Sequence, residues 1–188
     1  MKLVVISGGI GSGKSVLSHI VNVMGYPTYD CDREAKRLMN ESQNLREALT
    51  KLLGGDAYNS NGHLNRAYVS QCIFRDEALR NAMNALVHPA VKDDIAKWAK
   101  AQETTVAFVE TALLAESGLS SMANEIWIVD APVELRIERV MKRSGLTSDQ
   151  VKARIASQTT IDFPCARHFM NDGKVSLLRQ LVEALREL

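Results

Sequence analysis

Short apolar runs alternate along this chain with longer stretches in which apolar residues recur at helical spacing. Five short runs fit strands, and three of them are apolar and rich in β-branched residues, which is typical of buried strands. The five runs cover residues 3–6, 27–30, 104–110, 125–130 and 168–170. Strands that alternate with helices form parallel sheets with helices on both faces. The pattern therefore predicts an α/β fold with a five-stranded parallel sheet and right-handed connections.

The long stretch between residues 34 and 101 contains no convincing strand pattern. We expect helices here, with a break near Ser42, an end at Gly54 and an N-cap at Asn65. Pro89 should break or kink the helix that begins near residue 77, because proline lacks the N–H that a helix interior needs.

Three helices are predicted after the fourth strand. Pro132 opens the first, residues 147–150 match a capping box that starts the second, and Asp172-Gly173 turns the chain into the third. The residues expected to face inward are Val133, Ile137, Val140 and Met141 on the first helix, and Leu178, Leu181, Val182 and Leu185 on the last. These patterns predict a single domain with a core of residues 1–33, 102–135 and 166–188, a helical insertion of about 34–101 and a small lid of about 136–165.

The segment between the first strand and the first helix is rich in glycine and ends in Lys14-Ser15. Its spacing, G-x-x-x-x-G-K-S, indicates a phosphate-binding P-loop in this strand–helix context. Glycines let the backbone approach an anion, and successive N–H groups bind it at the positive end of the helix dipole. Lys14 would reach the β- and γ-phosphates of a nucleoside triphosphate, and Ser15 would bind Mg²⁺. The remaining residues assigned to the nucleotide are Gly9, Gly11, Ser12 and Gly13.

Acidic residues follow two of the predicted strands. Asp30 and Asp32 have two interpretations that neither pattern nor spacing separates: an N-cap with a favourable first-turn charge, or a carboxylate at the ligand-binding edge of the sheet. In the second, Asp32 would accept the proton of an attacking hydroxyl. Glu110 is either a solvated charge or a ligand of substrate or of a Mg²⁺-bound water.

Three arginines on the helix after the fourth strand recur at i, i+3 and i+7: Arg136, Arg139 and Arg143. They share a face that differs from the predicted apolar stripe. A solvated basic face is the usual explanation, but a polyanionic ligand is expected here, and we therefore favour phosphate contacts.

Composition limits the remaining classes. The chain has 188 residues and a net charge of +1, which gives no general attraction to nucleic acid or anionic membranes. Three widely spaced cysteines and four histidines without metal-ligand spacing predict reduced thiols and no metal cluster. We find no signal peptide and no apolar run of transmembrane length, so we expect a cytoplasmic protein. The oligomeric state stays open.

The ordered motifs resemble the dephospho-coenzyme A kinase family. The family typically has G-G-I-G-S-G-K-S-T followed by D-A-D, and this chain has Gly8 to Ser15 and then Asp30-Cys31-Asp32. The similarity continues through Asn61 to Arg66, which is similar to the family's D-G-x-L-D-R, and through His88-Pro89. Later matches are Leu113-Leu114-Ala115-Glu116, Arg139, Arg143, Gln158 and Asn171-Asp172-Gly173. The P-loop is generic, whereas the ordered set is specific and covers nearly the whole chain.

The resemblance implies that ATP, with Mg²⁺, phosphorylates the ribose 3′-hydroxyl of dephospho-CoA, which is the last step of CoA synthesis. Asp32 then matches the family's general base, assisted by Asp30, with Lys14 and Arg139 as further catalytic residues. The insertion, with Arg66 and His88, matches the lobe that binds the acceptor, and Glu110 joins the substrate site. No nucleic acid or membrane partner is implied.

Four positions depart from the family pattern. Val16 replaces a threonine after the P-loop serine, which removes a hydroxyl near the α-phosphate but keeps the backbone N–H as a nucleotide contact. Glu110-Thr111-Ala112 stands where D-x-P is common, and Asn65 replaces an aspartate. Arg136 replaces a common glutamine, and for that reason we expect Arg136 to matter much less than Arg139.

Other classes fit less well. A P-loop kinase for another small hydroxyl compound or a nucleoside monophosphate shares every feature except the ordered motif set. A GTPase switch would need an N-K-x-D motif, which does not occur. A nucleic-acid ATPase would be expected to carry a basic surface.

Overall fold

The computed structural model describes residues 1–158 and 163–188. Two compact units make up the chain: the first contains residues 1–30 and 102–188, and the second contains residues 31–101. The strands, all in the first unit, are β1 (Lys2–Ser7), β2 (Thr28–Asp30), β3 (Val106–Glu110), β4 (Glu125–Asp130) and β5 (Arg167–Met170). The helices of the first unit are α1 (Lys14–Val23), α6 (Leu114–Ser117), the 3₁₀ turn η2 (Leu119–Met122), α7 (Val133–Ser144), α8 (Ser148–Ala156) and α9 (Leu177–Leu185).

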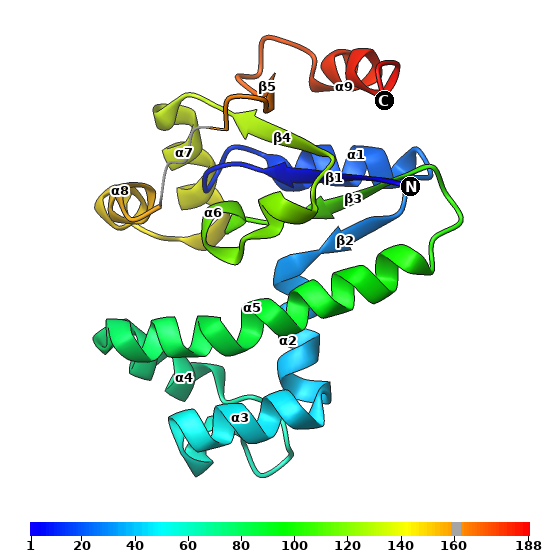
Figure 1. Cartoon of the computed structure of the whole chain (residues 1–188). Coiled ribbons are helices and arrows are strands. Elements are labelled where there is room, and N and C mark those ends of the chain that lie inside the picture. Colours follow the sequence, from blue (N-terminus) through cyan, green and yellow to red (C-terminus); the bar gives the residue numbers. More distant parts are fainter. Residues whose placement is uncertain (159–162) are drawn as a thin grey trace. The chain divides into compact units, whose positions relative to one another are not determined.

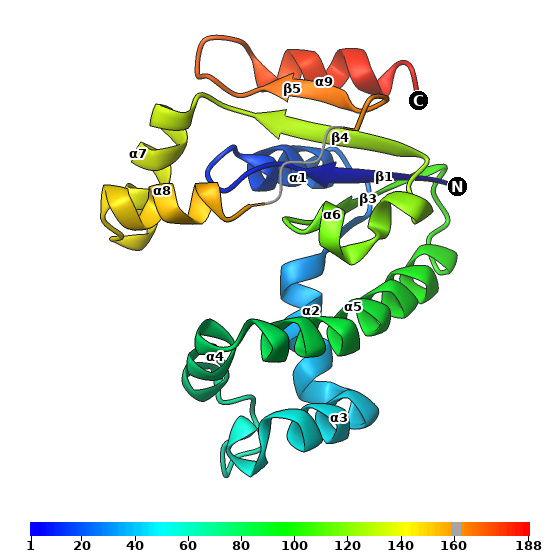
Figure 2. The ribbon, with the colours of Figure 1, turned by 60° about the vertical axis from the view of Figure 1, so that its left-hand side comes forward.

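Within the described residues, these strands form one parallel sheet in the order β2-β3-β1-β4-β5. Figures 1 and 2 show β1 flanked by β3 and β4, with β5 at the edge beside α9. The predicted five-stranded parallel α/β fold is confirmed. The short α6 and η2 between β3 and β4 were missed, because a four-residue helix has too few residues to show a period.

The core of the first unit lies between the sheet and the helices α1 and α9. Trp127 of β4 packs its ring 5.2 Å from Phe108 of β3 and 4.9 Å from Phe169 of β5, measured between ring centroids. Leu17 of α1 and Leu181 of α9 join the same buried cluster. On the other face of the sheet, η2 contacts β1. Burial on both faces is what keeps the P-loop at the end of β1 on a rigid support.

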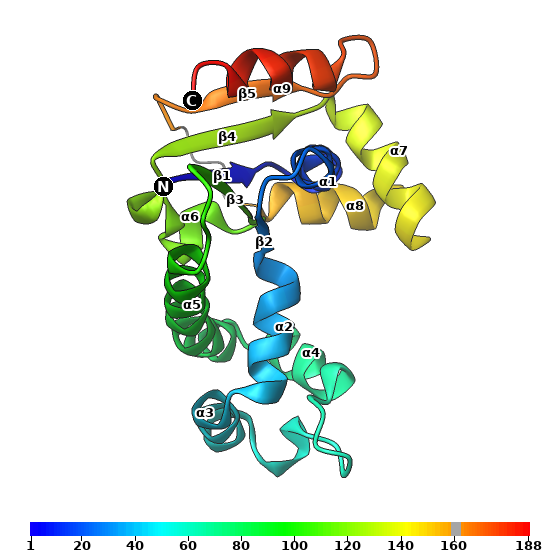
Figure 3. The ribbon, with the colours of Figure 1, turned by 90° about the vertical axis from the view of Figure 1, so that its right-hand side faces the viewer.

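Helix α5 organises the second unit, which contains α2 (Cys31–Glu41), α3 (Gln43–Leu53), η1 (Gly55–Ala57), α4 (Arg66–Arg75) and α5 (Glu77–Lys100). Figure 3 views α5 nearly along its axis, and this helix contacts α2, α3 and α4. Asn65 caps α4 through its side chain, as predicted, and Ser42, where a break between helices was expected, caps α3.

Helix α5 continues through Pro89, so of the break or kink expected there, the break is wrong. Buried Met83, Val87, Val91 and Ile95 lie four residues apart and extend one apolar face across the proline. Proline in a helix costs about 3 kcal/mol. Burial of that continuous face against three helices outweighs the cost.

Two predicted apolar faces are partly wrong. On α7, Val140 is buried, whereas Val133 and Met141 are exposed. On α9, Leu181 is buried as expected, but Leu178 is exposed. The capping box of Thr147 and Gln150 at the start of α8 is confirmed. Part of the predicted lid, residues 159–162, lies outside the described residues.

Candidate phosphate site and adjoining pocket

The P-loop runs from Gly8 at the end of β1 to Ser15 in the first turn of α1. Gly11 and Gly13 have φ angles of 79° and 100°, in the left-handed region that favours glycine. A Cβ on Gly11 would lie 2.6 Å from the Arg136 carbonyl oxygen, and one on Gly13 would overlap the Asn171 side chain. The loop therefore needs glycine at both positions for its conformation and for its close neighbours.

Helix α1 begins without a side-chain cap, because its N-cap residue is Gly13. The first N–H groups of a helix need partners, and the positive end of the dipole favours an anion. No acidic residue lies in the first turn of α1 to supply that charge. The helix start is therefore suited to phosphate oxygens.

The hydroxyl of Ser15 donates to Oε1 of Glu110 at 2.7 Å. Glu110 ends β3, next to β1 in the sheet, and it is in register with Ile6 of β1 and Asp30 of β2. The connection from β1 runs to β2, on the side of β1 where β3 lies. The connection from β3 runs to β4, on the opposite side of β1, so the direction of the connections reverses here. Ligands bind at this kind of switch point in open α/β sheets.

A hydroxyl and a carboxylate at this edge fit Mg²⁺, which prefers oxygen ligands and usually keeps waters and substrate phosphates around it. Among the described residues, no group of three or more His, Cys, Asp or Glu side chains could hold a metal ion. An ion at Ser15 and Glu110 would therefore depend on the nucleotide for most of its ligands.

Arg139 of α7 contacts the P-loop through backbone carbonyls. Its Nη1 donates to Gly11 O and Ser12 O, both at 3.4 Å, and its Nη2 donates to Asn171 O at 3.0 Å. The amide of Asn171 donates to Ser12 O at 2.8 Å. Arg139 thus contacts the loop itself, and its expected contact with phosphate stays a prediction.

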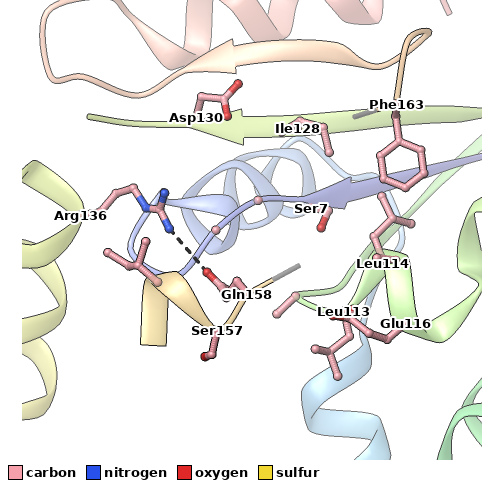
Figure 4. Close-up of a pocket in the computed structure, with 15 residues that line it drawn as sticks. Ser7, Leu113, Leu114, Glu116, Ile128, Asp130, Arg136, Ser157, Gln158 and Phe163 are labelled. Carbon is pink, nitrogen blue, oxygen red and sulfur yellow. Dashed lines mark hydrogen bonds between the residues drawn. The ribbon is translucent and has the colours of Figure 1, made fainter. Parts of the chain in front are cut away.

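Arg136 is the second arginine at the loop. Its Nε donates to Ile10 O at 2.9 Å, and Nη2 lies 3.5 Å from Oε1 of Gln158, the pair joined by a dashed line in Figure 4. The same Gln158 oxygen accepts the N–H of Ile10 at 2.7 Å. Burial lowers the pKa of Arg136, while the nearby carboxylate of Asp130 acts in the opposite direction.

Arg143 is exposed and makes no hydrogen bond or ion pair with the described residues. The three arginines therefore do not act as one stripe: two hold the loop and the third faces solvent. The predicted apolar residue Val140 and the predicted basic residue Arg136 also both place side-chain atoms against the loop, at Gly11 and Gly9 respectively.

A pocket of about 380 Å³ adjoins the P-loop. Gly8 and Gly9 form one side, while Asp130 and Arg136 supply opposite charges. Figure 4 shows Phe163, Ile128 and Leu114 on the opposite side of the pocket from Arg136. Apolar walls with a few charged groups are typical of small-molecule sites.

The predicted residues Asp32, Arg66 and His88 belong to the second unit. Asp32 is an exposed residue in the first turn of α2, and it has no hydrogen-bond or ion-pair partner among the described residues. Arg66 is exposed at the start of α4, and His88 is half-buried one residue before Pro89 in α5.

Sequence reasoning missed the contacts of Gln158 and Asn171 with the loop. Both residues had stood out only as members of the ordered motif set. Their partners lie 148 and 159 residues away in the chain, and no local period carries a signal over such a separation.

Comparisons with known proteins find one family repeatedly. The family model described as Dephospho-CoA kinase matches residues 2–168. A dephospho-CoA kinase from Bacteroides fragilis is 35% identical over 184 residues, which cover 96% of this chain and 89% of the relative. One from Porphyromonas gingivalis is 41% identical over 153 residues, covering 81% of this chain and 75% of the relative.

Solved structures show the same fold. A protein from Thermus thermophilus superposes with a TM-score of 0.83 at 31% identity, covering 100% of this chain and 97% of the other. A dephospho-CoA kinase from Campylobacter jejuni superposes with a TM-score of 0.71 at 22% identity, covering 100% of this chain and 97% of the other. No helix among the described residues is long and apolar enough to span a membrane.

The family match extends well beyond a generic nucleotide-binding motif. It runs through the P-loop, Glu110, the helical second unit and the arginines of α7. The chain therefore belongs to the dephospho-CoA kinase family.

Proposed function

We propose that this protein transfers the γ-phosphoryl group of ATP to the ribose 3′-hydroxyl of dephospho-CoA, giving CoA and ADP. The observation that carries the proposal is the extent of the family match, which includes residues 31–101 as well as the phosphate site. A match confined to the P-loop would leave the acceptor open, because P-loop folds serve many activities.

The nucleotide site is assigned to the first unit. Lys14 and the amides of the P-loop bind the β- and γ-phosphates, and Ser15 with Glu110 holds Mg²⁺. When bound, Mg²⁺ would neutralise charge on the phosphates. Phosphoryl transfer requires little covalent chemistry from the protein. Its catalysis depends mainly on positioning the reactants and on stabilising the charge of the transition state. Arg139 and Arg143 are assigned to the nucleotide phosphates as well.

Asp32 is assigned the role of general base. The 3′-hydroxyl oxygen forms a bond to the γ-phosphorus while the bond from that phosphorus to the β–γ bridging oxygen breaks. The hydroxyl proton passes to the carboxylate of Asp32, and ADP leaves. An exposed carboxylate without a partner among the described residues is available for such a transfer.

The acceptor is assigned to the second unit, with Arg66 and His88 as contacts, and to Asp30 and Glu110 at the sheet edge. Arg66 is exposed and has no ion-pair partner among the described residues, which suits contact with a phosphate of the acceptor. Helices α7 and α8 belong to the proposed lid, which would exclude water from the phosphoryl group.

The runner-up is a P-loop kinase for a different hydroxyl compound or a nucleoside monophosphate. The test is ADP release by the purified protein with ATP, Mg²⁺ and a panel of acceptors: dephospho-CoA, AMP, shikimate and gluconate. We expect dephospho-CoA to be used far faster than the others. Equal rates with AMP, or no reaction with dephospho-CoA, would overturn the proposal.

A further inference from the structure

The backbone of Ile10, near the tip of the P-loop, is held on both sides by side chains that come from outside the loop. Its carbonyl oxygen accepts from Nε of Arg136 at 2.9 Å, and its N–H donates to Oε1 of Gln158 at 2.7 Å. Arg136 also reaches Gln158 itself, at 3.5 Å (Figure 4). Three residues thus form a closed set of contacts around one loop position.

The contact to the carbonyl of Ile10 determines where the next N–H points. In a trans peptide the C=O and the following N–H lie in one plane and point in opposite directions. The chain contains no cis peptide among the described residues. When Arg136 draws the Ile10 carbonyl to its side, the N–H of Gly11 is therefore directed away from α7.

The amide of Gly11 is available for a ligand, because its N–H has no hydrogen-bond partner among the described residues. The next two carbonyls, of Gly11 and Ser12, are held by Arg139. The N–H of Gly13, which shares a peptide plane with the Ser12 carbonyl, is likewise without a partner in the described part of the chain. Side chains from α7 thus hold three successive carbonyls of the loop.

We infer that Arg136 and Gln158 are positioning residues that clamp Ile10 and thereby direct the Gly11 amide towards a bound phosphate. Arg136 stands where a glutamine is common, so the sequence comparison predicted a minor role for it. The structure supports a larger role, because Arg136 is half-buried and bonded to the loop, as Arg139 is.

Arginine fits this role because its planar group presents donors in two directions at once. Nε of Arg136 donates to the Ile10 carbonyl, while Nη2 donates to Oε1 of Gln158. A lysine would keep the charge but has a single donor group at the end of a flexible chain. A direct attraction between charge and phosphate would survive the change to lysine, whereas a clamp would not.

The inference rests on the phosphate site of the proposed function and is tested without the acceptor. Binding of inorganic pyrophosphate and of ADP is measured by isothermal titration calorimetry for wild type, Arg136→Gln, Arg136→Lys, Gln158→Ala and the double variant Arg136→Gln/Gln158→Ala. Lys142→Gln is the matched control, because Lys142 is an exposed basic residue of the same helix without a partner among the described residues. Thermal melts without ligand accompany each variant.

We expect each single variant to weaken both ligands by about three- to tenfold, the value of one hydrogen bond. Gln158→Ala removes no charge, so a lower affinity of this variant for the two ligands reports on the geometry of the loop. The double variant should bind about as weakly as the weaker single variant, because both side chains hold the same residue. Lys142→Gln should bind like wild type.

The inference is overturned if Arg136→Lys or Gln158→Ala binds both ligands as tightly as wild type, or if the two losses simply add. Failure of wild type to bind pyrophosphate or ADP would instead refute the phosphate site. Normal binding of these ligands, with no reaction on dephospho-CoA, would refute only the proposed acceptor.

Discussion

Ser15 and Glu110 lie 95 residues apart in the chain and are joined by a hydrogen bond of 2.7 Å from the serine hydroxyl to the carboxylate. This bond connects the first turn of α1 to the end of β3 across the switch point of the sheet. It places a neutral oxygen and a charged oxygen together where a metal-bound nucleotide would enter. We therefore expect Glu110 to affect the requirement for Mg²⁺.

Glu110→Gln should raise the Mg²⁺ concentration for half-maximal activity by about tenfold, since the amide can still accept from Ser15 but carries no charge. The measurement is a Mg²⁺ titration of ADP release at fixed ATP. High Mg²⁺ should restore most of the rate. An unchanged Mg²⁺ requirement would remove Glu110 from the metal site.

Lys14→Ala should lose most of the activity while keeping the fold. The ammonium neutralises charge that grows on the β–γ bridge and on the transferring group. The variant therefore loses an interaction that forms during catalysis. The measurement combines kcat with a circular-dichroism melt in the absence of nucleotide. A large fall in Tm would indicate a structural role for Lys14 instead.

Asp32→Asn should lower kcat by about 10²- to 10⁴-fold, which is the usual contribution of a general base. The amide keeps the shape of the side chain but cannot accept the proton of the ribose hydroxyl. ATP affinity should change little, which a competition assay with a fluorescent nucleotide would check. Activity within about threefold of wild type, together with lower stability, would favour a purely helix-stabilising first-turn charge.

Arg139→Lys should lower kcat at least about tenfold, because one ammonium cannot replace a guanidinium that spans two loop carbonyls and Asn171. Steady-state kinetics give kcat for this variant and for Lys142→Arg. The second variant is the control, because Lys142 is an exposed residue of α7. Equal kcat values for the two variants would show that Arg139 has no special role.

The second unit should lose stability in acid through Glu34. A hydrogen bond from Arg37 and a weaker contribution from the hydrogen bond of Arg33 hold the pKa of Glu34 below its ordinary value of 4.5. Because the folded-state pKa is the lower one, the stabilisation is complete above about pH 4.5 and is lost as the pH falls through the folded-state pKa. Glu34→Gln should therefore flatten the dependence of unfolding free energy on pH in this range.

Urea unfolding of wild type and Glu34→Gln at pH 7, 4 and 3 measures this dependence. Arg37→Gln is the matched control, since it removes the arginine that lowers the pKa of Glu34 most and leaves the carboxyl in place. This variant should flatten the dependence of the unfolding free energy on pH in acid to a similar extent. Parallel curves for all three proteins would contradict the prediction.

Features with local causes were determined by the sequence alone. Apolar runs rich in β-branched residues marked the longer strands. The side chains of Asn65 and Thr147 marked helix starts, because a cap bonds to an N–H only two or three residues away. The P-loop was equally clear, since its glycines, lysine and serine are consecutive. The same local reasoning identified Ser15 and Glu110 as candidate ligands separately.

The tertiary structure decided which of these local features meet. Periodicity shows which residues share a face of α7, but it does not show whether that face contacts the P-loop or solvent. Packing places Arg136 and Val140 against Gly11 and leaves Val133 exposed. Pro89 remains inside a helix for a related reason, since burial of one apolar face depends on the helices beside it. The contacts of Gln158 and Asn171 with the loop exist only after the sheet has brought distant segments together, because a hydrogen bond depends on distance in space and not on separation along the chain.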